Sequence, residues 1–265
     1  MSGPNQQSGV HPSAVIAEGA VVPESCTVGP FCVVGENVVL GEDCELISNV
    51  VIDGHTTIGA RNRFFPFASI GCEPQDLKYK GEPTRLRMGS DNVMRECVTI
   101  SRGTVGGGGE TVLGDHCLLM TCAHVGHDTQ VGSHVIIANG AAIAGHVVIE
   151  DYATVGALNQ IHQFCRVGKH AYLGGGTTVV QDVLPYSLTS ARRETKTFGM
   201  NKIGLQRRGF SEPQLQNLSR AYRKLLAGKM NTAQALEAIQ STREMSDEVR
   251  YLVEFIQASQ RGIVK

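Results

Sequence analysis

The sequence contains no tryptophan, and aromatic residues make up only 5% of its 265 residues. Large aromatic rings usually supply much of the volume of a layered globular core. Glycine is abundant instead, with 31 residues. This composition argues against an ordinary layered fold and indicates a repetitive one in which small residues recur.

The chain also lacks an excess of positive charge, because 24 basic and 25 acidic residues give a formal net charge of -1. A nucleic-acid-binding domain normally carries a basic excess, so no such partner is expected. No apolar run is long enough to cross a bilayer, and the first residues show no signal or transit pattern. The eight cysteines follow no compact disulfide framework, so we expect free thiols and a cytoplasmic location.

What the sequence does contain is a six-residue period. Aliphatic or aromatic residues stand at every sixth position from Val10 to Ile70 and again from Leu113 to Val179, and Met88, Met94 and Ile100 keep the first phase between them. The position four residues after each of these anchors is usually alanine, cysteine or threonine. Such a period fits neither an amphipathic helix nor a single alternating strand, and hexapeptide repeats specify a parallel β-helix.

The period predicts a mainly β fold shaped as a triangular prism. Each hexad forms a short strand and a corner, three hexads close a coil of 18 residues, and the anchors fill the interior. We expect this prism over residues 1–185, with loop excursions near 71–87 and 101–112, where the anchors are lost or the phase slips. Residues 186–265 are expected to form a small α-helical domain, with helices starting at Ser211, at Asn231 or Thr232, and at Ser246, the last reaching Gly262.

Residues that are 18 positions apart should lie about 5 Å apart on successive coils. One column is then His127, Gly145 and Gln163, and the next is Asp128, His146 and Phe164. Histidine is suited to proton abstraction near neutral pH. A histidine on a prism face is often only a solvated surface residue, but His124, His127, His146 and His162 cluster within two coils, and this favours a catalytic role for His127.

Two other chemistries fit the same segment less well. His124, His127 and His146 are candidates for a zinc site of the kind found in gamma-type carbonic anhydrases, although nothing in their spacing requires a metal. Cys122 is close to His124 in sequence, but no cysteine shares the His127 column, so we expect Cys122 to be a packed small side chain and not a nucleophile.

Basic residues gather in the sequence just after the end of the predicted prism. They are Arg192, Arg193, Lys196, Lys202, Arg207, Arg208, Arg220, Arg223, Lys224 and Lys229. A basic surface of this kind is either simply solvated or steers an acidic partner such as an acyl carrier protein.

Several longer segments are more specific than the hexads. They are VGPFCVVG, QDLKYKGEPT, the stretch from CAHVGHDTQVG to AGHVVIEDYATVGALNQIHQF, and FGMNKIGLQRRGFS. Along nearly its whole length the chain resembles bacterial UDP-N-acetylglucosamine O-acyltransferases, which catalyse the first step of lipid A assembly. The resemblance implies a left-handed coil, a homotrimer with active sites between subunits, and transfer of an (R)-3-hydroxyacyl chain from acyl carrier protein to the sugar 3-hydroxyl. It implies no cofactor beyond the 4'-phosphopantetheine on the carrier, and no metal.

The resemblance also assigns roles to individual residues. His127 is the general base, Asp128 orients its imidazole, and the Gly145 N–H stabilises the oxyanion. The substrate-binding positions implied by the match are Asp76, Lys78, His124, His146, Gln163, Gly175, Asn201 and Arg207.

The chain departs from the family pattern at three places. Ser101 stands where the family commonly has histidine, and Ile203 where it commonly has glutamate. Residues 190–197 include one extra residue near the expected end of the acyl groove. A 3-amino sugar acceptor therefore stays open, as does the acyl chain length, and a non-catalytic hexapeptide scaffold is the remaining alternative.

Overall fold

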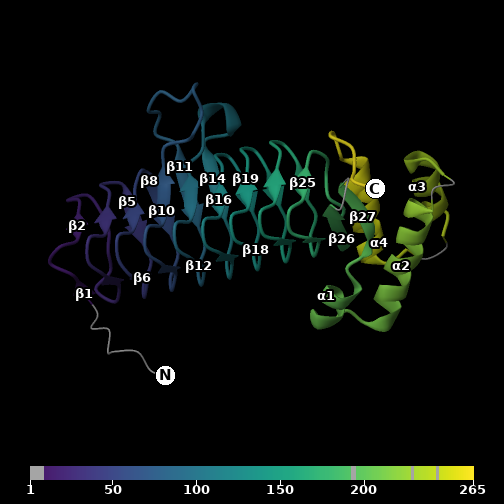
Figure 1. The fold of residues 1–265 in the computed structure, drawn as a ribbon, viewed down its shortest axis with the longest axis horizontal. Coiled ribbons are helices and arrows are strands. Elements are labelled where there is room, and N and C mark those ends of the chain that lie inside the picture. The colour runs from purple at the N-terminus through teal and green to yellow at the C-terminus, as the bar shows by residue number, and fades with distance from the viewer. Residues whose placement is uncertain (1–8, 192–194, 228–229, 243–244) are drawn as a thin grey trace.

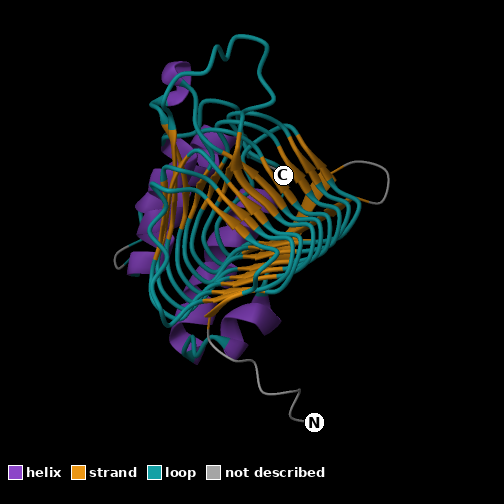
Figure 2. Ribbon diagram, turned by 90° about the vertical axis from the view of Figure 1, so that its left-hand side faces the viewer, coloured by secondary structure: helices purple, strands orange, loops and turns teal. Residues whose placement is uncertain are grey.

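The computed structural model describes residues 9–191, 195–227, 230–242 and 245–265. The chain forms a left-handed parallel β-helix whose coils stack along one axis, with helices at its C-terminal end (Figure 1). Seen along this axis, the superposed coils form a prism with strands on its faces and turns at its corners (Figure 2). The mainly β prediction is confirmed.

Three sheets form the faces of the prism. The 11-stranded sheet contains β1 (Gly9–Val10), β3 (Thr27–Val28), β6 (Glu45–Leu46), β9 (Arg63–Phe64), β12 (Val93–Met94), β15 (Leu118–Leu119), β18 (Ile136–Ile137), β21 (Thr154–Val155), β24 (Tyr172–Leu173), β26 (Ser187–Ala191) and β27 (Thr195–Met200). The 9-stranded sheet contains β2 (Val15–Ile16), β4 (Val33–Val34), β7 (Val51–Ile52), β10 (Ser69–Cys72), β13 (Thr99–Ser101), β16 (His124–Val125), β19 (Ala142–Ile143), β22 (Gln160–Ile161) and β25 (Thr178–Val179). The 7-stranded sheet contains β5 (Val38–Leu40), β8 (His55–Ile58), β11 (Arg85–Met88), β14 (Glu110–Leu113), β17 (Gln130–Val131), β20 (Val148–Ile149) and β23 (Arg166–Val167).

The anchors fill the prism as the period predicts. Those from Val28 to Ile70 and from Leu113 to Val179 are all buried, and so are the three methionine and isoleucine anchors between them. Successive anchors stack in register, for example Val125 on Ile143. Val10 is exposed, however, and the next two anchors are only partly buried, because the first coil has a neighbour on one side only.

Two excursions leave the prism. Residues 73–84 connect β10 to β11, and residues 102–109 connect β13 to β14 and include the 3-10 helix η1 (Val105–Gly107). Both project near β11 and β14 (Figure 1). They occupy the segments where the anchors are lost or change phase, so the expected interruptions are present.

Three C-terminal helices begin where the sequence predicts. They are α2 (Glu212–Leu226) after Ser211, α3 (Thr232–Gln240) after Asn231, and α4 (Asp247–Gln257) after Ser246. Pro213 near the start of α2 and reciprocal side-chain caps at the first two helices explain these starts.

Two expectations about this region were wrong. Strands β26 and β27 form an antiparallel hairpin before the first helix, and a short helix, α1 (Lys202–Arg207), follows it. β26 also pairs in parallel with β24, so the sheet continues after the six-residue period has stopped. Helix α4 ends at Gln257, short of Gly262, and the Ser259 hydroxyl then donates to Asp182 Oδ2 at 2.7 Å as the chain returns to the prism.

The buried apolar side chains form two clusters. One fills the prism and ends with Val183 and Val264, and the other starts at Leu184 and joins the helices to the hairpin. The hydroxyl of Tyr251 on α4 donates to Glu150 at the edge of the prism, which fixes the helices to the end of the rod. The division at residue 185 remains a prediction.

Candidate active site

His127 and Asp128 lie at the corner that joins β16 to β17, between the 9-stranded and 7-stranded sheets. Gly145 and His146 occupy the same corner one coil further on, and Gln163 occupies it on the coil after that. The His146 N–H donates to the His127 carbonyl at 2.9 Å. The stacking thus brings together residues that are 18 positions apart in sequence.

The His127 imidazole is held by its neighbour in sequence. Its Nδ1 lies 2.7 Å from Asp128 Oδ2, so Nδ1 donates a hydrogen bond to the carboxylate. The Asp128 side chain is fully buried, whereas that of His127 is 16% exposed. With the proton on Nδ1, Nε2 carries a lone pair and can act as a base.

The Asp128 carboxylate is also held from the second excursion. It accepts hydrogen bonds from the Thr104 N–H at 2.8 Å and from the Thr104 hydroxyl at 2.6 Å. The Asp128 N–H in turn donates to Thr111 Oγ1 at 2.8 Å. Sequence reasoning did not find Thr104 or Thr111; the phase slip and the four successive glycines nearby were the only signal of a special local structure.

Gly145 lies directly beside the imidazole. A Cβ atom on Gly145 would be 2.6 Å from His127 Cε1 and 2.7 Å from Nε2, so any other residue at this position would displace the imidazole. Among the described residues, none accepts a hydrogen bond from the Gly145 N–H. A backbone donor without an acceptor beside a base can hold the negative oxygen of a tetrahedral intermediate.

Two more histidines adjoin this pair. The His146 ring meets that of His127 edge-on with centroids 5.0 Å apart, and its Nδ1 lies 3.8 Å from Asp128 Oδ2. The Thr99 hydroxyl lies 2.7 Å from His124 Nδ1. Burial and the neighbouring His127 lower the pKa of His124, so His124 is a neutral hydrogen-bonding group near pH 7.

The residues that could hold a metal ion differ from the three histidines that the sequence suggested. The group that could hold a cation is His127, Asp128 and His146, with ligand atoms within 4.8 Å of one another, and His124 is outside it. The oxygens of Asp128 already accept hydrogen bonds from Thr104 and His127. This arrangement favours a proton-transfer pair.

The cysteines do not supply a nucleophile at the His127 corner. Five cysteines are buried as small apolar side chains, namely Cys26, Cys32, Cys44, Cys117 and Cys165. Cys122 is exposed, so the expectation that it is packed was wrong. It lies at the corner between the 11-stranded and 9-stranded sheets, away from the corner of His127.

The first excursion carries Asp76 and Lys78, where Asp76 Oδ1 accepts the Lys78 N–H at 3.0 Å. This loop is held by Arg102, which is only 8% exposed. The guanidinium donates to the Tyr79 hydroxyl at 2.8 Å and to the Gly71 carbonyl at 2.9 Å. Sequence reasoning did not identify Arg102, because its contacts with Tyr79 and Gly71 depend on how the first excursion packs against the prism.

The other expected substrate residues lie elsewhere on the chain. Gly175 is at the corner between β24 and β25, which is a different corner from that of His127. Asn201 caps α1 by accepting the Gly204 N–H at 3.2 Å and donates to the His170 carbonyl. Arg207 is exposed at the end of α1. One chain therefore does not bring these three residues to the His127 corner.

Ser101, one of the departures from the family pattern, is 6% exposed and pairs with Cys72 across β13 and β10. Ile203, the other substituted position, is 65% exposed on α1. Of the extra-residue segment 190–197, residues 192–194 lie outside the described residues.

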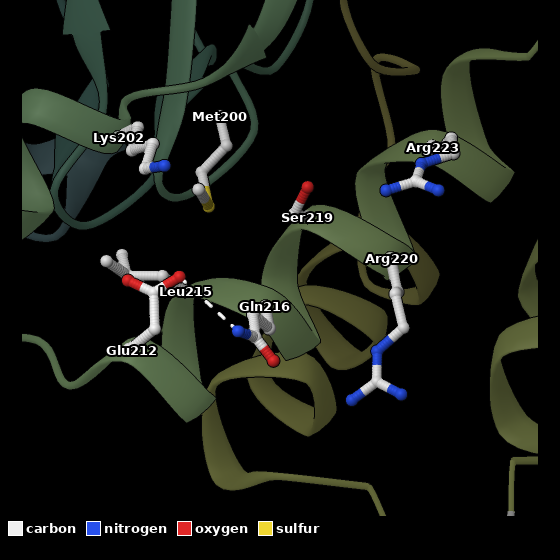
Figure 3. A pocket seen from close by; sticks show the side chains of 8 residues that line it. All are labelled: Met200, Lys202, Glu212, Leu215, Gln216, Ser219, Arg220 and Arg223. Atoms are coloured by element: carbon white, nitrogen blue, oxygen red, sulfur yellow. Dashed lines mark hydrogen bonds between the residues drawn. The ribbon is translucent and has the colours of Figure 1, made fainter.

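Part of the basic region lines a cavity of about 330 Å³ between α1, the end of β27 and α2. Lys202 and Met200 face Arg220 and Arg223 across it (Figure 3). Other basic residues are engaged: Lys224 donates to the Ala238 carbonyl at 2.6 Å. Arg192, Arg193 and Lys229 lie outside the described residues.

The chain is similar to known families and solved structures. A family described as "Udp N-acetylglucosamine O-acyltransferase; Domain 2" matches residues 182–264, and the bacterial transferase hexapeptide family matches residues 110–145. The solved UDP-N-acetylglucosamine acyltransferase of Francisella novicida is 39% identical, with a TM-score of 0.93 over 97% of this chain and 94% of that chain. The enzyme of Bacteroides fragilis 9343 is also 39% identical, with a TM-score of 0.94 over 97% and 100% of the two chains.

Curated sequences show the same relationship. An acyl-[acyl-carrier-protein]--UDP-N-acetylglucosamine O-acyltransferase of Pseudomonas syringae pv. tomato is 44% identical over 77% of this chain and 79% of that protein. The protein of the same name from Anaeromyxobacter sp. is 42% identical over 80% and 82% of the two chains. Together with the coils and the His127 corner, this likeness shows that the chain belongs to the UDP-N-acetylglucosamine O-acyltransferase family.

Proposed function

We propose that this protein transfers an (R)-3-hydroxyacyl chain from acyl carrier protein to the 3-hydroxyl of UDP-N-acetylglucosamine, as the first step of lipid A assembly. The observation that carries the proposal is the His127 corner, where a buried carboxylate holds the imidazole beside the Gly145 N–H, which has no acceptor in the part of the chain that the structure describes. The substrates follow from the family, and the geometry supplies a base and an oxyanion donor for acyl transfer.

The reaction needs no covalent acyl-enzyme. His127 Nε2 takes the proton of the sugar hydroxyl while that oxygen forms a bond to the thioester carbonyl carbon. The carbonyl oxygen becomes negative and accepts a hydrogen bond from the Gly145 N–H. When the intermediate collapses, the C–S bond breaks and the imidazolium gives its proton to the pantetheine sulfur. Asp128 stabilises the imidazolium throughout and keeps its own charge.

We propose that a homotrimer completes the site. The outer face of the 9-stranded sheet, which ends at the His127 corner, exposes Val15 at 60%, Val33 at 39% and Val51 at 36%. A column of exposed apolar side chains is typical of a surface that another subunit covers. Within one chain, Gly175 and Arg207 lie away from the His127 corner. A neighbouring subunit can bring its own Gly175 and Arg207 to that corner.

The cavity lined by Lys202, Arg220 and Arg223 is the proposed docking point for the acidic carrier. Three basic residues and one acidic residue, Glu212, line the cavity together with Met200 and Leu215. This excess of positive charge beside apolar side chains suits an anion on an apolar arm. The 4'-phosphopantetheine arrives on the carrier, and the mechanism uses no other cofactor. The eight free cysteines suit the reducing environment of the cytoplasm. None of the helices among the described residues could span a membrane.

The test is product analysis with the purified protein. UDP-N-acetylglucosamine and a panel of 3-hydroxyacyl carriers of different lengths are incubated with it, and the products are identified by mass spectrometry. An O-acylated nucleotide sugar, formed in step with release of the free carrier thiol, is the expected product. If no carrier in the panel is consumed by an enzyme that sediments as a folded trimer, the proposal is wrong.

A further inference from the structure

We propose that Thr104, in the glycine-rich second excursion, is a positioning residue that fixes the Asp128 carboxylate and, through it, the His127 imidazole. This inference rests on the proposed function, because it assigns a role within the same site. The six-residue repeat and the substrate-binding positions do not account for the excursion at residues 102–109, and the proposed role of Thr104 does.

The contacts are directional and buried. Thr104 is 7% exposed and Asp128 5% exposed. The Thr104 N–H donates to Oδ1 at 2.8 Å and its hydroxyl to Oδ2 at 2.6 Å, so one residue engages both carboxylate oxygens. Oδ2 is also the oxygen that accepts from His127 Nδ1 at 2.7 Å. The plane of the carboxylate, and with it the direction of the hydrogen bond to the imidazole, is therefore set by Thr104.

The loop around Thr104 is itself fixed. The Thr104 carbonyl accepts the N–H groups of Gly107 at 3.1 Å and Gly109 at 2.8 Å. Gly107 packs against the carboxylate so closely that a Cβ there would be 2.0 Å from Asp128 Cγ. Gly106, one residue earlier, has open space at the same position. The glycines thus allow the loop to close directly over Asp128.

The other ionisable groups that face the pair are His146, with Nδ1 3.8 Å from Asp128 Oδ2, and His124 beside His127. The loop itself presents no charged side chain to the carboxylate. Its contribution is two hydrogen bonds that fix the orientation of the carboxylate. Without the Thr104 hydroxyl, Asp128 Oδ2 loses a donor, and the imidazole that donates to the same oxygen should be held less precisely.

The test compares Thr104→Val, which removes the hydroxyl at nearly constant volume, with Thr104→Ser, which keeps it. We expect Thr104→Val to lower kcat roughly 10-fold, the scale of one hydrogen bond to a charged group, and to leave KM for both substrates little changed. Thr104→Ser should restore kcat. Thr56→Val is the matched control, because Thr56 is a buried threonine whose hydroxyl donates only to a backbone carbonyl, that of Asp53.

A second matched pair uses the glycines. Gly107→Ala should lower kcat by pushing the carboxylate away, whereas Gly106→Ala should leave it unchanged. An unchanged kcat in Thr104→Val, or a loss of activity that only follows a lower Tm, would overturn the proposal. If the wild-type protein shows no acyl transfer, the proposed function is wrong. The NMR signal of the His127 Nδ1 proton, compared between wild type, Thr104→Val and Thr104→Ser, then still tests the positioning role, and an unchanged signal in Thr104→Val would contradict it.

Discussion

Gly145 and His127 lie one above the other on successive coils, so close that a methyl group on Gly145 would be 2.6 Å from Cε1 of the imidazole. The contact follows from the 18-residue coil, since 127 and 145 differ by one full turn. It places a backbone N–H beside the base without any side chain between them.

Gly145→Ala should therefore disturb the base and leave the prism intact. The added methyl group must push the imidazole away from the Gly145 N–H, and we expect kcat to fall by about 100-fold, as for loss of an oxyanion donor. Steady-state kinetics and sedimentation measure the two effects. A variant with normal kcat would show that the oxyanion is held elsewhere.

Asp128→Asn should be milder than removal of the base. His127→Ala is expected to lower kcat by roughly 10²–10⁴, the usual scale for a general base. The asparagine keeps the size of the side chain but loses the charge that stabilises the imidazolium. Asp151→Asn is the control, because Asp151 is an exposed carboxylate at a different corner of the prism from His127. Its Oδ1 accepts the Ser133 N–H at 2.8 Å. Equal losses at Asp128 and His127 would mean that the two act as one unit.

Arg102→Lys should weaken binding of the nucleotide sugar. The planar guanidinium donates to both Tyr79 and the Gly71 carbonyl, and an ammonium group cannot reproduce this geometry. The excursion with Asp76 would then lose its anchor. We expect KM for UDP-N-acetylglucosamine to rise about 10-fold with kcat little changed. Arg87→Lys, at an exposed arginine paired with Glu110, serves as control. A fall in kcat at unchanged KM would contradict this account of the loop.

Stability should fall as the pH drops below neutrality, partly through His170. Burial, and then the nearby Arg208 and Lys169, lower the pKa of His170 from 6.5 to about 4. Between these values the unfolded chain binds a proton that the folded protein does not, so stability decreases as pH falls through 6.5 toward 4. Allowing for solvent screening, the loss from this residue is on the order of 1 kcal/mol at pH 5.

His170→Phe should reduce that pH dependence, since phenylalanine can keep the ring stack between Tyr152 and Tyr186. Thermal unfolding at pH 7 and pH 5 measures it. The exposed His55, replaced in the same way, is the control and should leave the difference in Tm as in the wild type. The explanation fails if both variants keep the wild-type pH dependence.

The sequence predicted the prism well because its signal is local and repeated. Each anchor such as Ile143 must point inward for a hexad to close, and this fixes the phase of every residue on the coil. The hairpin of β26 and β27 was missed because it follows the last hexad, where pairing with β24 comes from position in space. The end of α4 was missed for a similar reason, since the chain is drawn back to Asp182.

The sequence by itself determined the coil, and with it the placement of His127, Gly145 and His146 on one corner, because a period of six residues converts spacing into proximity. Only the tertiary structure decided what holds that corner. Thr104 and Arg102 belong to an excursion that is out of phase with the repeat, so the atoms they meet depend on where the loop returns. The period predicts the positions of the residues that belong to the repeat, whereas the hydrogen-bond partners of the loop residues depend on how the loops pack against the prism.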